Sequence, residues 1–129
     1  MIKQIFYAKH YWKVIVFWNV DYDLFSDIAY ELLLIGFSKA AIAGMRKIMM
    51  AGQAKAVTCS SIEHHTSIVL FNQHSSKADY INSIVHEAEH IKQAMLKAYD
   101  VEDDGEPPAY TIGYLASRMY EVFKHFLFS

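Results

Sequence analysis

The chain has 129 residues, enough to bury a hydrophobic core without disulfide bonds or oligomerisation, and we expect one domain over residues 1–129. Its hydrophobic fraction of 53% and aromatic fraction of 15% lie at the apolar end of the globular range. A formal net charge of -2 provides no basic field for a phosphate backbone, so we do not expect a nucleic-acid partner.

Cysteine content and the N-terminal pattern indicate the compartment. Cys59 is the single cysteine, so no intrachain disulfide can form and a reducing environment is favoured. We expect its side chain to be a small buried hydrophobe rather than a ligand or nucleophile. Val14–Trp18 is too short for the apolar region of a signal peptide, and no stretch reaches the ~18 apolar residues of a membrane span. We therefore expect a soluble, cytoplasmic protein.

Residue type and turn signals predict five elements before residue 73, in the order strand, helix, helix, strand, strand. They span Lys13–Trp18, Leu24–Ile35, Lys39–Met50, Ala54–Ser60 and Ser67–Asn72. Asp21 or Asp23 can cap the first helix, and Gly36 can end it. Ser38 and Gly52 do the same for the second helix. This order predicts a small mixed sheet backed by helices on one face.

Lys77–Tyr99 is the strongest predicted helix of the chain. Ser76, with Asp79 three residues later, resembles a capping box at its start. One apolar stripe follows its length, at Ile81, Ile84, Ala88, Ile91 and Met95. At about 100° per residue, His86 and His90 fall roughly opposite this stripe. That position suits a solvent-facing pair, and it equally suits a helix whose back packs on the sheet while its front forms the floor of a cleft.

A last helix is predicted after an acidic loop. Residues 100–106 carry five acids in seven positions, which is typical of a solvated loop that can also present a metal ligand. Pro107 and Pro108 suit the first helical turn that follows. The helix then extends to about Phe126, with apolar positions at Ile112, Leu115, Met119, Val122 and Phe126.

Residues 86–90 spell His-Glu-Ala-Glu-His, an H-E-x-x-H motif inside the strongest predicted helix. A spacing of four places His86 and His90 one turn apart on the same face, so both imidazoles can reach one metal ion. Glu87 lies beside them, where a carboxylate can take a proton from a metal-bound water. The motif therefore predicts zinc chemistry.

A catalytic zinc site needs a third protein ligand and one position open to water. The downstream candidates are Glu102, Asp103, Asp104, Glu106, Glu121 and His125. Glu106 is favoured because Pro107 fixes the entry to the last helix and holds the carboxylate on a rigid element. Asp103 or Asp104 can do the same chemistry from a looser loop. A site without a third protein ligand is the remaining alternative.

The motif followed by a glutamate on the next helix resembles the gluzincin group of zinc metallopeptidases, in a minimal single-domain form. The runs Gly105–Tyr110 and Gly113–Tyr114 also resemble short zincin-like proteins of bacteria and their phages. The resemblance covers roughly residues 54–125 and implies an α+β zincin-like fold. In that fold a small mixed sheet backed by helices carries the H-E-x-x-H helix, and a C-terminal glutamate helix follows.

The resemblance also implies a function, a zinc-dependent peptidase. It implies Zn2+ bound by His86, His90 and Glu106, with Glu87 as the general base in peptide-bond hydrolysis. It further implies that a peptide or protein substrate lies extended along the strand before the motif helix, Ser67–Asn72, as an edge strand.

Tyr110 lies one helical turn beyond Glu106 and is a candidate catalytic residue, because a tyrosine can donate a hydrogen bond to an oxyanion. Larger gluzincins often place an acidic residue there, which orients a histidine ligand. In this chain that orientation must come from another residue or from a backbone carbonyl. We also expect no second domain to wall the cleft, so the substrate is expected to be held weakly or together with a partner.

Other interpretations of the motif are a solvated helix face that happens to hold two histidines, a bound metal without catalysis, and a metallohydrolase of non-peptide substrates. The main alternative is a catalytically inactive metal-binding or protein-interaction module with a zincin-like fold. His64 and His65 are expected in a solvated hairpin turn. His74 is expected as a turn residue, with a substrate contact as its alternative. His10 and His125 are expected at the surface.

Overall fold

A four-stranded mixed sheet with strand order β1-β2-β4-β3 forms the centre of this computed structural model, which describes residues 1–101 and 106–124. The strands are β1 (Ile2–Ala8), β2 (Trp12–Trp18), β3 (Ala56–Ser61) and β4 (Thr66–Phe71). The pairs β1/β2 and β3/β4 are antiparallel, whereas β2 and β4 run parallel. The fold class is thus α+β, with the mixed sheet that the sequence predicts.

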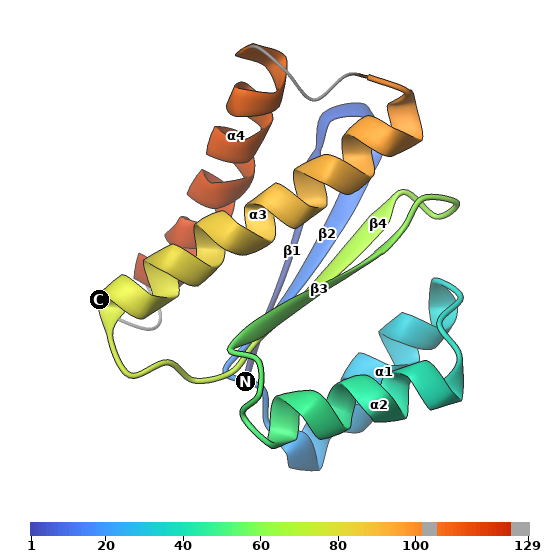
Figure 1. Cartoon of the computed structure of the whole chain (residues 1–129), viewed down its shortest axis with the longest axis vertical. Coiled ribbons are helices and arrows are strands. Elements are labelled where there is room, and N and C mark those ends of the chain that lie inside the picture. Colours follow the sequence, from blue (N-terminus) through green and yellow to red (C-terminus); the bar gives the residue numbers. More distant parts are fainter. Residues whose placement is uncertain (102–105, 125–129) are drawn as a thin grey trace.

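Helices cover both faces of the sheet. The α-helices are α1 (Phe25–Leu34), α2 (Lys39–Met50), α3 (Lys77–Tyr99) and α4 (Glu106–Val122), and short 3-10 turns lie at η1 (Lys9–Tyr11) and η2 (Tyr22–Leu24). Figure 1 shows the strands between α1 and α2 on one side and α3 and α4 on the other. The expected single helical layer is therefore wrong. Within the described part of the chain, no helix has the length and apolar character needed to cross a membrane.

Strand β2 explains the second layer, because its residues are apolar on both faces. Val14, Val16 and Trp18 belong to the core that α3 and α4 cover. Ile15 and Phe17 belong to the core that α1 and α2 cover. Successive side chains of a strand point to opposite faces, so a run without alternating polar residues is stable only when both faces are covered.

Strand β4 lies inside the sheet and is buried along its whole length. The predicted substrate-facing edge at Ser67–Asn72 is therefore wrong. The edge beside α3 is β3, whose residues are all partly exposed. Polarity explains the difference, since β3 carries Thr58, Ser60 and Ser61, whereas residues 68–71 of β4 are continuously apolar.

Local signals place α3 as predicted. The Ser76 hydroxyl accepts a hydrogen bond from the Asp79 backbone N–H at 3.1 Å, which caps the N-terminus. Asp100 ends the helix in a left-handed conformation. Four positions of the predicted stripe are buried, whereas Ile81 is 41% exposed. The helix boundaries therefore follow from the sequence, as does most of the buried face.

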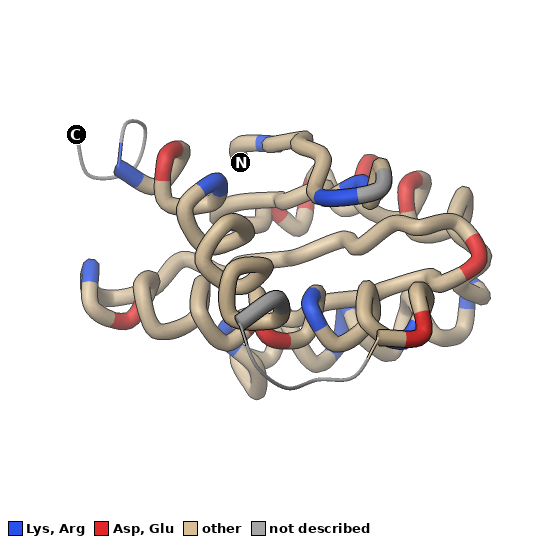
Figure 2. Tube along the Cα trace, turned by 90° about the horizontal axis from the view of Figure 1, so that it is seen from above, with Lys and Arg blue, Asp and Glu red and all other residues tan. Residues whose placement is uncertain are grey.

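Charged side chains are interspersed over the described chain. Figure 2 shows Lys and Arg mixed with Asp and Glu along the trace, without a large region of one sign. This distribution agrees with the weak net charge of -2.

Candidate metal centre

The two motif histidines lie in the middle of α3 and are exposed. Their Nε2 atoms are 3.2 Å apart, and the rings meet edge to face at an interplanar angle of 85°. In a tetrahedral site with Zn–N bonds of ~2.0–2.1 Å, two nitrogen ligands lie about 3.3 Å apart. This separation matches that of two ligands on one zinc ion, and it is also the distance of an N–H···N hydrogen bond between the two rings.

Glu87 is buried beneath this pair, with 3% of its surface exposed. Its Oε1 accepts a hydrogen bond from the Thr58 hydroxyl at 3.0 Å, and its Oε2 lies 4.0 Å from His86 Nε2. The carboxylate therefore joins α3 to the edge strand β3, with one oxygen held by Thr58 and the other near the histidine pair.

A cleft of about 300 Å3 separates α3 from β3 beside the histidines. Thr58 and Ser60 line it from the strand, and His90, Gln93 and Lys97 line it from the helix. Its walls are mainly polar side chains, in contrast to the two cores of the sheet. The cleft is thus open to a ligand that approaches along the edge of the sheet.

Glu89, the second acid of the motif, has partners on its own helix. Its Oε1 accepts hydrogen bonds from Lys92 Nζ at 2.7 Å and from Gln93 Nε2 at 3.1 Å. Lys92 is 4% exposed, so this ion pair is partly shielded from water. Glu89 thus pairs with neighbours one turn further along α3, and Glu87 is the motif acid whose carboxylate lies 4.0 Å from His86.

The predicted third ligand, Glu106, is the first residue of α4, and its side chain lies outside the described residues. The alternatives Glu102, Asp103, Asp104 and His125 also lie outside them. Glu121 is described and pairs with Arg118 Nε at 3.7 Å on α4. Among the side chains that the structure describes, no group of three His, Cys, Asp or Glu is placed to hold a metal ion. The described part of the site is thus two imidazoles and a neighbouring carboxylate.

Tyr110 lies on α4 and is 68% exposed. It lines a hollow of about 560 Å3 together with Tyr7, Lys9 and Tyr114, at the end of β1. The histidine cleft, in contrast, is lined from α3, from β3 and from Ile62 just after it. The structure therefore does not bring Tyr110 together with the histidine pair.

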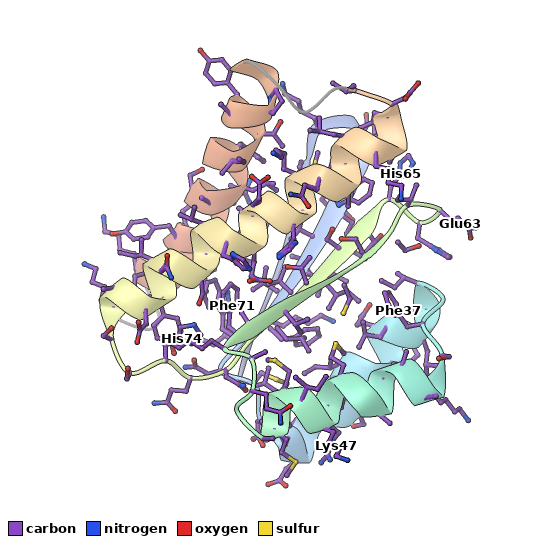
Figure 3. All side chains as sticks on the ribbon, in the orientation of Figure 1. Phe37, Lys47, Glu63, His65, Phe71 and His74 are labelled. Atoms are coloured by element: carbon purple, nitrogen blue, oxygen red, sulfur yellow. The ribbon has the colours of Figure 1, made fainter. Side chains whose placement is uncertain are left out.

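His74 is buried, which sequence reasoning missed. It lies in the connection before α3, as expected, but only 8% of its surface is exposed. Its Nδ1 lies 2.6 Å from the Asn72 carbonyl oxygen, its Nε2 lies 2.7 Å from Ser83 Oγ, and its ring stacks on Tyr80. Burial lowers the pKa of His74 below its usual value. Figure 3 places it with Phe71 near the first turns of α3, so it braces the fold and does not contact the cleft.

The hairpin histidines lie at the tip of β3 and β4, where Figure 3 labels His65. His65 stacks on Trp12, and His64 Nδ1 lies 2.8 Å from the Ser61 hydroxyl. Both are exposed, as predicted for a turn. They form a separate group from the α3 pair.

Cys59 is partly buried, so the small buried hydrophobe that the sequence predicts is only incompletely covered. Loss of hydration, with a smaller contribution from the Glu87 charge, raises the pKa of its thiol to about 11. Its Sγ lies 3.1 Å from Met45 Sδ. The thiol is therefore neutral near pH 7 and lies against apolar neighbours, as expected for a residue without a ligand or nucleophile role.

No family model, curated protein or solved structure matches this chain. The assignment of the candidate centre therefore depends on the residues of the chain itself. Three observations define it, namely the His86–His90 separation, the buried Glu87 and the cleft between α3 and β3.

Proposed function

We propose that the chain is a zinc-dependent hydrolase, most simply a peptidase of the zincin-like type, with His86 and His90 as metal ligands and Glu87 as general base. The 3.2 Å separation of the two Nε2 atoms above a buried carboxylate carries this proposal. A solvated pair of histidines needs no acid beneath it, and a purely structural metal site needs no base.

The chemistry of the donor set fits zinc, which accepts imidazole nitrogen and carboxylate oxygen ligands. A zinc ion at this position supplies a Lewis acid and lowers the pKa of a water to near neutrality. Thr58 fixes the Glu87 carboxylate through Oε1, while Oε2 lies close to His86. These contacts support the proposed role of Glu87, which would accept a proton on the side of the histidines and return it to a leaving amine.

We propose Glu106 as the third ligand from its place in the sequence, where it begins α4 next to Pro107 and a helix terminus holds a carboxylate rigidly. The described part of α4 packs against β1, at the opposite edge of the sheet from β3, so the position of α4 lends this choice no support. Asp103 and Asp104 are the alternatives that a ligand scan must include. A peptide substrate is favoured because the cleft follows an edge strand, and an extended peptide can add to such an edge through its backbone.

Metal content is the first test. Protein purified without chelator or a metal-binding tag is expected to contain about one zinc per chain by elemental analysis, since three ligands form one site. His86→Ala and Glu106→Ala are expected to lose this zinc. His64→Ala is the matched control, because His64 is an exposed histidine in the hairpin turn. Absence of zinc, with none taken up when zinc is added, overturns the proposal.

Hydrolysis is the second test, with fluorescein-labelled casein as the probe. Glu87→Gln is expected to keep the zinc and lose at least about 100-fold of the activity, as removal of a general base does. Unchanged hydrolysis in this variant contradicts the role of Glu87.

The alternative is an inactive module that binds metal or a protein partner. One observation favours it, because the described residues contain no group of three His, Cys, Asp or Glu side chains that could hold a metal ion. It predicts bound zinc without casein hydrolysis in the wild-type chain, and no change on Glu87→Gln.

A further inference from the structure

The edge strand β3 separates two hollows of different chemistry. On its α3 face, Thr58 and Ser60 line the histidine cleft. On its α2 face, Val57 and Cys59 line an apolar hollow of about 420 Å3 whose opposite wall is α2. Alternate residues of one strand therefore line two different sites, as the two-residue period of a strand requires.

The hydrogen-bonding pattern of the β3/β4 hairpin defines which backbone groups face outward. The Asn72 N–H donates to the Lys55 carbonyl at 2.9 Å, and the register continues from this pair along the hairpin. Directly opposed residues of an antiparallel pair alternate between bonded and non-bonded. The backbones of Ala56, Thr58 and Ser60 therefore point away from β4. Because β3 is the last strand in the sheet order, their N–H and C=O groups face the open edge.

We propose that the substrate is an extended polypeptide segment that pairs with β3 as an additional strand and inserts an apolar side chain into the hollow between β3 and α2. This inference rests on the proposed function and gives it a substrate class. The open backbone groups of β3 favour a strand as the occupant, since an extended backbone can pair with them in sequence.

Strand geometry connects the two hollows. Side chains of neighbouring strands that lie on the same face are about 4.5–5.5 Å apart. A bound strand therefore places the side chains beside Val57 and Cys59 toward α2, and the next residues along it toward the histidine cleft. The residue that enters the apolar hollow is thus a direct sequence neighbour of one that faces His90. Recognition and proposed cleavage lie within one short segment.

The lining of the hollow selects the side chain. No charged residue is among those that line it, and its walls include Met45, Ile48 and Val57. Burial of a charge there without a partner is unfavourable, whereas an aliphatic or aromatic side chain gains the free energy of leaving water. The flexible thioether of Met45 lets the hollow fit apolar groups of different shape. We therefore expect a preference for Leu, Met or Phe over Asp, Lys or Glu.

The test measures binding, which requires no hydrolysis. A positional-scanning library of acetylated, amidated nonapeptides is titrated against zinc-loaded protein that carries Glu87→Gln. One position is expected to prefer apolar over charged residues by at least about tenfold, the equivalent of ~1.5 kcal/mol from burial of one side chain. Equal affinity for apolar and charged residues at every position, or no binding at all, overturns the proposal.

Two helical glycines provide a matched pair of variants. Gly44 lines the hollow from α2, and Gly113 lies on α4; at both, an added Cβ meets no atom within 4 Å. Gly44→Leu fills the hollow and is expected to weaken the best peptide at least about tenfold, because its apolar side chain stays in water. Gly113→Leu is expected to leave the affinity unchanged. Equal effects of the two variants overturn the proposal.

Hydrogen exchange reports the pairing itself. The amides of Ala56, Thr58 and Ser60 are expected to become protected when the peptide is bound. Protection of these amides without peptide, together with a concentration-dependent dimer, contradicts the proposal in favour of a second copy paired through β3.

Apolar-selective binding without casein hydrolysis separates the two proposals, since it retains this one and rejects the hydrolase. Casein hydrolysis without any apolar preference in peptide binding retains the hydrolase proposal and rejects the proposal that β3 and the apolar hollow bind the substrate.

Discussion

The Thr58–Glu87 hydrogen bond allows the charge state and position of the proposed base to be tested by stability alone. Thr58→Val removes the hydroxyl and keeps the shape of the side chain, so its cost measures the 3.0 Å bond and no cavity. A hydrogen bond to a charged group contributes ~1.5–3 kcal/mol, and one between neutral groups ~0.5–1.5 kcal/mol. The same substitution is therefore expected to cost about 1 kcal/mol more in the wild-type chain than in the Glu87→Gln variant.

The assay is urea unfolding followed by circular dichroism at pH 7, with EDTA present so that metal binding does not contribute. With a slope of ~1–3 kcal/mol/M, a cost of ~2 kcal/mol moves the midpoint by roughly 1 M, which is easily measured. Ser60→Ala is the control, since the Ser60 hydroxyl lies 2.6 Å from Ser67 Oγ on β4 and has no charged partner among the described residues. Its cost should be equal in both backgrounds.

Equal costs of Thr58→Val in the two backgrounds refute the reasoning. That result means that Thr58 does not hold an ionised carboxylate, and the general-base role of Glu87 then loses its structural support. A cost close to zero in both backgrounds means that water replaces the hydroxyl and that Glu87 is more hydrated than its 3% exposure indicates.

Three further predictions concern the rest of the fold. Burial lowers the pKa of His74 below its usual 6.5, so below pH 6.5 the unfolded chain binds more protons than the native chain. The free energy of unfolding should therefore fall as the pH decreases below 6.5. Urea midpoints measured from pH 8 to 5 should show this fall, and His74→Phe should reduce it. With a thiol pKa of about 11, Cys59 should react with iodoacetamide at pH 8 about 100-fold more slowly in the native chain than in urea, and equal rates contradict the assigned burial. Gly36 has a φ of +98°, so Gly36→Ala should destabilise the chain by roughly 1 kcal/mol in thermal unfolding. Gly44 lies inside the α2 helix, where an added Cβ meets no atom within 4 Å, so Gly44→Ala should stabilise the chain by a similar amount.

The helices were predictable because their signals are local. Ser76 caps α3, a stripe of apolar residues faces the sheet, and Asp100 ends the helix, all within one segment of chain. The separation of His86 from His90 follows from the same local geometry, since residues four apart lie on one face. Sequence spacing alone therefore located the centre of the candidate site.

Strand β1 was missed because its inward positions include a glutamine. Gln4 is buried, and its side chain accepts a hydrogen bond from Trp18 Nε1 at 3.1 Å and donates one to the Arg118 carbonyl at 2.7 Å. These partners lie 14 and 114 residues away along the sequence. A buried glutamine looks like a solvent-facing residue when its partners are distant in the sequence. Gln4 therefore interrupts the alternation of apolar and polar residues that would indicate a strand.

The edge of the sheet was wrongly assigned although the sequence contains a signal for it. The continuously apolar residues 68–71 are typical of a strand covered on both faces, and the polar alternation at Thr58 and Ser60 is typical of an edge. The prediction for Ser67–Asn72 came from the resemblance to zincins, which places the substrate along the strand before the motif helix. The burial of Glu87 was not predictable in this way, because it depends on β3 packing beside α3.

The apolar hollow gives the first third of the chain a role in the proposed activity. The resemblance to zincins begins near residue 54, whereas α2, which forms the far wall of the hollow, precedes it. In the proposed hydrolase, elements beside the cleft can supply affinity for the substrate. Here β3 connects the two, because its alternate side chains contact the histidine cleft and the α2 wall. If both proposals hold, substrate selectivity and metal binding are separable, and Gly44→Leu should change the first while the proposed zinc content stays the same.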